Sequence, residues 1–237
     1  NVKYTFYWVG TWDKEHLAFV PDHEEPKMFD YGEHFIGPSV MVDEDGTPIL
    51  FSIAQDRRRE QEHYDAGWAH NAGLPVELSL RDNNDLGLQP IEELESLRGE
   101  SLVSFENKGM KEANEMIQDV EGDMLEIILD VDPKEAEKVG LKVRQSENGK
   151  EETLVYYDAT EETFNIDRNQ SSLDPDVSKG VQGGELKLNG DRWQLHLYLD
   201  RSMVEAYANG QKSITSRVYP TSYDALGIEL WSEGGDP

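Results

Sequence analysis

Short strands separated by tight turns are the strongest pattern in this sequence. An Asx-Gly dipeptide occurs at four places between apolar or β-branched residues: Asp45-Gly46, Asn148-Gly149, Asn189-Gly190 and Asn209-Gly210. These dipeptides tolerate the positive φ angles that two-residue hairpin turns require. The pattern therefore predicts antiparallel hairpins along much of the chain.

The segment from Trp193 to Asp200 shows the alternation expected of a half-buried strand. Every second side chain in it is apolar, which places one side of the strand in a core. The apolar set is Trp193, Leu195, Leu197 and Leu199, and the polar set is Gln194, His196 and Tyr198. Together with the turns, this segment predicts a mainly β protein.

The helical signal is weak, and its best example begins at Pro90 and stops at Gly99. Proline suits the first turn of a helix, acidic residues follow it, and glycine often ends a helix. Ile91, Leu94 and Leu97 recur at a spacing of three and form one apolar stripe. We expect a short connecting helix here, with a domain boundary near Gly99.

Charge and composition exclude several classes of protein. The 237 residues carry a formal net charge of −27, spread along the whole chain, so they repel phosphate backbones and anionic membrane surfaces. We therefore expect no nucleic-acid and no membrane partner.

The five Trp, ten Tyr and seven Phe residues are too many for a disordered acidic tail. The absence of cysteine excludes disulfides and zinc–thiolate sites.

A search for catalytic motifs finds none that is specific. The six histidines include no His-Glu-x-x-His pair, and the chain has neither a Gly-x-Ser-x-Gly elbow nor a phosphate-binding glycine loop. Carboxylates are so abundant that no pair stands out as a general acid and base. We accordingly expect no metal and no cofactor.

Two unusual segments carry a family resemblance. The first is Phe29-Asp-Tyr-Gly-Glu-His-Phe-Ile-Gly-Pro-Ser39, and the second is Leu199-Asp-Arg-Ser-Met-Val-Glu-Ala-Tyr-Ala-Asn-Gly210. Both resemble glycoside hydrolase family 32, the invertases, levanases and inulinases that cleave β-fructofuranosides. Further matches follow in order, among them Gly67-Trp-Ala69, Leu74-Pro-Val-Glu-Leu-Ser-Leu80 and Pro90-Ile-Glu-Glu-Leu94.

The resemblance implies an all-β fold made of the C-terminal part of a five-bladed β-propeller followed by a β-sandwich. Residues 1–98 would supply the last blade or blades, and residues 101–237 the sandwich. The family's catalytic residues lie in Asn-Asp-Pro-Asn, Arg-Asp-Pro and Glu-Cys motifs, none of which occurs in this sequence. We therefore expect no catalytic residue in this chain, and we expect the chain to be a piece of something longer.

The resemblance also implies substrate-binding residues. Asp30 of the Asp-Tyr-Gly motif is expected to point into the sugar pocket, with Tyr31 beside it and Gly32 in a turn. The alternative for Asp30 is a structural role in a loop. Glu33 and His34 are candidates for the pocket rim or for a solvated loop. Trp68 either flanks the pocket or is a buried blade aromatic.

Some positions depart from the family pattern or serve structure. Ile36, Ile53 and Val76 stand where the family usually has Tyr, Trp and Arg, which puts the sugar preference in doubt. We expect the cluster Arg57-Arg-Arg59 to form a surface face paired with Glu60 and Glu62, with a substrate clamp as the alternative. In the second segment we expect Asp200 and Arg201 to join a polar network between strands, and Glu205 to face the propeller.

The favoured function is the C-terminal portion of a retaining glycoside hydrolase that acts on β-fructofuranosides of the sucrose, levan or inulin type. Its partners would be a fructose-containing saccharide and the N-terminal propeller portion of the same enzyme, and the chain alone would be inactive. The competing hypotheses are a non-catalytic sandwich for sugar binding, stability or oligomerisation, and a pseudo-enzyme subunit that pairs with another propeller half.

Overall fold

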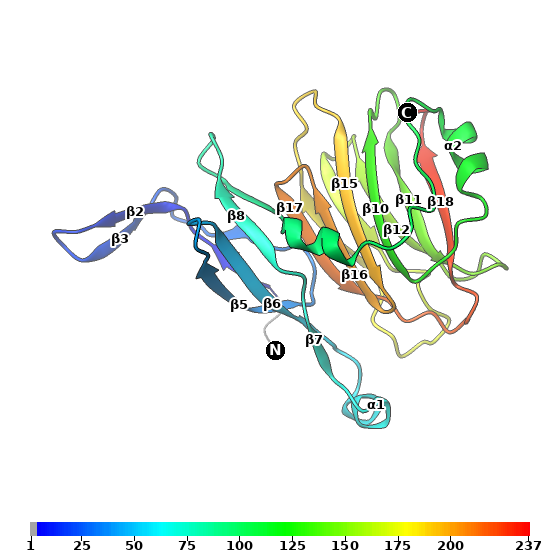
Figure 1. The fold of residues 1–237 in the computed structure, drawn as a ribbon, viewed down its shortest axis with the longest axis horizontal. Helices are drawn as coiled ribbons and strands as arrows, with labels where there is room; N and C mark the ends of the chain where they lie inside the picture. The colour runs from blue at the N-terminus through cyan, green and yellow to red at the C-terminus, as the bar shows by residue number, and fades with distance from the viewer. Residues whose placement is uncertain (1–3) are drawn as a thin grey trace.

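The structure, a computed structural model, describes residues 4–237 and is dominated by β-strands. The first three residues of the predicted segment 1–98 lie outside the described residues. The prediction of a mainly β protein is confirmed. Figure 1 shows two parts side by side: the residues up to about 90 at one end and a two-layered sandwich at the other.

The first part is built on one antiparallel sheet with two small ribbons beside it. The strand order in this sheet is β5-β6-β8-β9, and a short strand, β7, also pairs with β6. Their bounds are β5 (Phe35–Val42), β6 (Pro48–Gln55), β7 (His70–Ala72), β8 (Val76–Leu80) and β9 (Leu86–Pro90). The ribbons are β1 (Phe6–Tyr7) with β4 (Lys27–Met28), and the hairpin β2 (Gly10–Asp13) with β3 (Ala18–Pro21), which projects at the far end of Figure 1.

The second part consists of two antiparallel sheets that enclose one apolar core. The first sheet has the order β10-β15-β16-β17, with β10 (Met124–Val131), β15 (Trp193–Asp200), β16 (Met203–Ala208) and β17 (Lys212–Arg217). The second has the order β14-β13-β12-β11-β18, with β11 (Lys138–Gln145), β12 (Thr153–Asp158), β13 (Thr163–Asp167), β14 (Val181–Glu185) and β18 (Gly227–Glu233). Apolar side chains from both sheets form the shared core.

The core follows from the strand alternation. On β15 the side chains of Trp193, Leu195, Leu197 and Leu199 are buried, as predicted, while Gln194 is exposed. Burying side chains of this size stabilises the sandwich by about 1.5–3 kcal/mol each. The sandwich therefore has an apolar core of its own.

Three of the four predicted hairpin turns connect paired strands. Gly46 joins β5 to β6, Gly149 joins β11 to β12 and Gly210 joins β16 to β17, and each has a positive φ. Asn189-Gly190 is different, because it leads from β14 in one sheet to β15 in the other. A turn dipeptide fixes the local reversal of the chain but not the sheet that the next strand joins.

The helices agree less well with the sequence pattern. The predicted helix after Pro90 is a 3₁₀ helix, η1 (Glu92–Leu97). Two α-helices were not predicted, α1 (Glu60–Ala66) and α2 (Met110–Ile117). Each spans only about two turns, too short for a clear periodicity. Helix α2 is held by the sandwich core, into which it packs Ala113 and Ile117.

The two parts meet where β17 runs beside the segment from Phe29 to His34. A parallel bridge joins Asp30 to Ser213, and the Tyr31 amide donates to the Ser213 carbonyl at 2.9 Å. A Cβ on Gly32 would lie 1.9 Å from the Thr215 carbonyl oxygen. Glycine is thus needed here because two backbones approach closely, which differs from the turn expected at this position.

We predict that Gly32→Ala destabilises the chain by about 2–3 kcal/mol, because the new methyl group has to push the segment away from β17. The free energy of unfolding from urea titration checks this. Gly99→Ala is the matched control, since a Cβ at Gly99 meets no atom within 4 Å. Equal stability of the two variants would contradict the close approach.

Candidate functional site

Asp30 connects the first part of the molecule to the sandwich. Its side chain is 1% exposed and accepts four hydrogen bonds, from the Gly32 amide at 2.7 Å, the Ser213 hydroxyl at 2.6 Å, and the amide and hydroxyl of Thr215 at 2.9 and 3.0 Å. Burial raises the pKa of Asp30, and these four donors oppose the rise. The contacts support the structural alternative for Asp30, and its role in sugar binding stays a prediction.

Tyr31 also lies against the sandwich. Its hydroxyl donates to the Glu185 carbonyl at 2.7 Å, and its ring packs on Gly184 of β14. The ammonium group of Lys212 lies 5.7 Å from the ring centroid. Tyr31 thereby ties the first part to both sheets of the sandwich, through Gly184 in one and Lys212 in the other.

Glu205 faces the first part of the molecule, as expected. It lies on β16, is buried, and accepts a hydrogen bond from the Leu74 amide at 3.1 Å. Burial, with a contribution from the charge of Asp30, raises the pKa of Glu205 to about 8. The opposing influences are the Leu74 amide and the positive charge of Arg217. Glu205 is consequently protonated in the folded protein at neutral pH.

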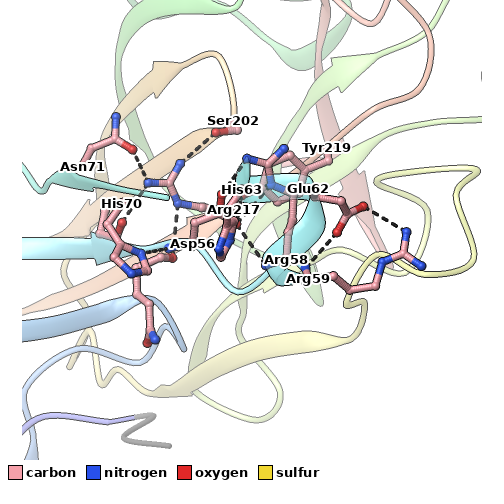
Figure 2. A network of polar contacts seen from close by, with 12 residues as sticks. Asp56, Arg58, Arg59, Glu62, His63, His70, Asn71, Ser202, Arg217 and Tyr219 are labelled. Carbon is pink, nitrogen blue, oxygen red and sulfur yellow. Dashed lines mark hydrogen bonds and ion pairs between the residues drawn. The ribbon is translucent and has the colours of Figure 1, made fainter. Parts of the chain in front are cut away.

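Arg217 is the centre of a polar network at the same junction. Figure 2 shows its guanidinium between the two parts of the molecule. It donates to the Gln55 and Ala54 carbonyls at 3.2 and 2.8 Å, to the Ser202 hydroxyl at 2.8 Å and to the Asn71 side chain. These acceptors belong to both parts, so one buried side chain links the end of β6 to the sandwich.

A second arginine beside this network is enclosed by aromatic rings. The guanidinium of Arg58 lies 4.7 Å from the ring centroids of both Trp68 and Tyr219, a distance typical of cation–π contacts. Arg58 also pairs with Asp56 at 2.6 Å, and Tyr219 donates to the same carboxylate at 2.8 Å. Burial alone would raise the pKa of Asp56, but the bonds from Arg58 and Tyr219 lower it to about 2. Asp56 is therefore ionised throughout the neutral range.

Glu33 and His34 complete the cluster. The guanidinium of Arg57 donates to the Glu33 carboxylate at 2.6 Å. His34 is buried, and burial together with the charges of Arg168, Arg217 and Arg57 lowers its pKa to about 3. The imidazole is therefore neutral at physiological pH.

The structure thus divides the five predicted site residues into two groups. Glu33, His34 and Trp68 lie around one set of arginines, and Trp68 is 39% exposed. Asp30 and Tyr31 instead contact β17 and β14. Whether any of these residues touches a sugar stays a prediction.

The arginine cluster differs from the surface face expected from the sequence. Arg59 does pair with Glu62, at 3.2 Å, but Arg57 and Arg58 turn inward to Glu33 and Asp56. Sequence reasoning also missed Arg217 and Arg168, both buried. The sequence signal that could have found such a residue is an arginine in a strand whose other side chains are buried. Arg217, the last residue of β17, shows this signal.

The polar network expected around Asp200 and Arg201 is not seen among the residues that the structure describes. Both residues are exposed at the turn between β15 and β16, and Arg201 has a positive φ. Within the described residues no group of His, Asp and Glu side chains could hold a metal ion. No described helix is long and apolar enough to cross a membrane.

Comparison with known proteins identifies the family. The model of the glycosyl hydrolases family 32 N-terminal domain matches residues 1–90, and the model of the family's C-terminal region matches residues 93–237. The chain therefore belongs to glycosyl hydrolase family 32, and it carries residues of both domains, not of the C-terminal one alone.

Relatives agree with this assignment. The chain is 30% identical to a sucrose-6-phosphate hydrolase of Staphylococcus xylosus over 99% of its own length and 46% of the relative, and 31% identical to fructan 1-exohydrolase w1 of Triticum aestivum over 93% and 45%. The fold resembles fructan 1-exohydrolase IIa of Cichorium intybus, with a TM-score of 0.80 and 18% identity over 98% of this chain and 52% of that one. The chain spans about half the length of the curated relatives it matches.

We predict that Glu205 makes the stability of the chain depend on pH. Its pKa is raised in the folded state, so its contribution is greatest below the ordinary carboxyl pKa and is lost as the pH rises toward 8. The loss is at most about 1.4 kcal/mol per pH unit. Glu205→Gln should remove it, because the amide oxygen still accepts from Leu74 and cannot ionise. Urea unfolding at pH 5 and pH 8 measures the difference.

Glu161→Gln, a change of one exposed carboxylate, is the control for this experiment. It should show the same loss of stability between pH 5 and pH 8 as the unchanged protein. An unchanged pH dependence in Glu205→Gln would show that Glu205 is not protonated in the folded state.

Proposed function

We propose that this chain is the C-terminal portion of a retaining β-fructofuranosidase and that it acts together with the N-terminal part of the propeller. The observation that carries the proposal is the ordered match of both family domains along the chain. The relatives' names, sucrose-6-phosphate hydrolase and fructan 1-exohydrolase, support a fructose-containing substrate. In this proposal the catalytic carboxylates belong to that N-terminal part.

The surface of the first part supports a partner of this kind. Eleven large apolar side chains between residues 6 and 53 are exposed: Phe6, Trp8, Trp12, Leu17, Phe19, Val20, Val40, Met41, Val42, Phe51 and Ile53. Such a concentration of exposed apolar residues marks an interaction surface. Strand β5 adds an open sheet edge, since it pairs on one side with β6 and is the end of the strand order. Neighbouring propeller blades would cover both features.

The activity of the chain alone and with its partner tests the proposal. We expect no turnover of sucrose, inulin or levan by the isolated chain, because a retaining glycosidase needs two carboxylates placed on either side of the scissile bond. Adding or fusing the N-terminal propeller portion of a family member should restore fructose release. Turnover by the isolated chain would overturn the proposal. Failure of every complementing portion, with the chain folded, would favour the non-catalytic sandwich.

We further propose that Trp68, together with Glu33 and His34, lines the rim of the sugar site. In the complemented enzyme, Trp68→Ala should raise KM about 3- to 10-fold with little change in kcat, the size expected for one aromatic contact. Tyr64→Ala is the control, because Tyr64 is 82% exposed on α1 nearby. Equal KM values for the two variants would assign Trp68 to packing against Arg58 and Arg217.

A further inference from the structure

Arg168 is a buried guanidinium that forms no ion pair within residues 4–237. It follows the last residue of β13 and is 2% exposed. Its single hydrogen bond from the side chain, to the Arg217 carbonyl, is long at 3.5 Å, and its Nε finds no acceptor among residues 4–237. A buried guanidinium left in this way is unfavourable, because its lost hydration is not replaced.

The neighbouring carboxylates are engaged elsewhere. Glu33 and Asp167 attract Arg168 electrostatically, but Glu33 bonds to Arg57 at 2.6 Å, and Asp167 accepts from the Asn169 amide at 2.8 Å. Arg217 is bonded to neutral acceptors. Two guanidinium charges, those of Arg168 and Arg217, therefore lack an ion-pair partner in the described part of the chain. This local excess of positive charge is opposite in sign to the formal net charge of −27 of the whole protein.

Two other buried polar side chains that have no partner among residues 4–237 point into the interior of the sandwich, one from each sheet. Gln182 is paired with Ile166 across β14 and β13, so its side chain points into the interior with Ile166, and Arg168 follows two residues later on that face. Ser216 is paired with Val204 and also points inward. Strands β13 and β17 contact each other, which closes this end of the sandwich. The amide of Gln182 and the hydroxyl of Ser216 have no partner in the described structure.

His34 reaches the cluster from the other part of the molecule. It is buried, the charge of Arg168 is the strongest electrostatic influence on it, and its Nδ1 has no partner in the part of the chain that the structure describes. A neutral imidazole can donate one hydrogen bond from this nitrogen. The junction thus offers unpartnered donors from Arg168, Gln182 and Ser216 of the sandwich and from His34 of the other part.

We propose that this cluster binds one small inorganic anion of chloride size at the junction of the two parts. An ordered water could accept from these donors, but it would leave the guanidinium charge uncompensated, whereas an anion supplies acceptor and charge together. The anion has to be small, because the side chains of Arg168, Gln182, Ser216 and His34 are all more than nine-tenths buried. The proposal does not depend on the enzymatic function proposed above.

Thermal unfolding at constant ionic strength tests the proposal, with sodium chloride exchanged for sodium methanesulfonate, a larger anion of the same charge. Chloride at ten times its dissociation constant should raise Tm by about 3–6 °C. Arg168→Gln should abolish this rise. Arg192→Gln should retain it, since Arg192 is an exposed arginine paired with Asp130. An equal Tm in both salts, or an undiminished chloride effect in Arg168→Gln, would overturn the proposal.

Crystals grown with bromide give a second measurement that needs no variant. An anomalous peak within hydrogen-bond distance of the Arg168 guanidinium would support the site. Ordered water there without an anomalous signal would show that the donors are hydrated and that the proposal is wrong. This result decides the question even if Arg168→Gln does not fold.

Discussion

The contact between Asp30 and β17 is the interaction on which the arrangement of the two parts depends. One carboxylate accepts four hydrogen bonds, and three of them come from a strand about 185 residues further along the chain. A hydrogen bond contributes about 0.5–1.5 kcal/mol net and has strict geometry. Gly32 lets the two backbones approach closely enough for these bonds to form. The register between the segment from Phe29 to His34 and β17 is thereby fixed.

Around this contact the junction is more polar than either core. Arg217 and Arg58 bond to carbonyls, a carboxylate and aromatic rings, and Glu205 lies close by as a neutral acid. Each buried polar group needs a partner with defined geometry, which makes the interface specific in orientation. The negative charge of the chain lies mainly on its surface, because most of its carboxylates are exposed. The junction, in contrast, concentrates arginines.

The sequence allowed the strands and turns to be predicted better than the contacts. The hairpin turns at Gly46, Gly149 and Gly210 and the alternation on β15 are local properties, and local patterns suffice to find them. Other features depend on residues far apart in the chain. They are the sheet that β15 joins, the hydrogen-bond partners of Asp30, and the inward direction of Arg57 and Arg58. Family resemblance predicted the family and a mainly β fold, but the hydrogen bonds of the Asp30 oxygens to β17 could not be predicted from it.

The apolar core of the first part has a consequence for how the protein is made on the ribosome. The cluster formed by Phe29, Phe35, Leu50, Val76 and Leu88 is completed by Tyr207 of β16. Synthesis proceeds from the N-terminus, so the first ninety residues emerge long before the side chain that closes their core. These residues have to wait, incompletely packed, until more than a hundred further residues have been translated. The two parts of the chain are thus coupled in biogenesis as well as in structure.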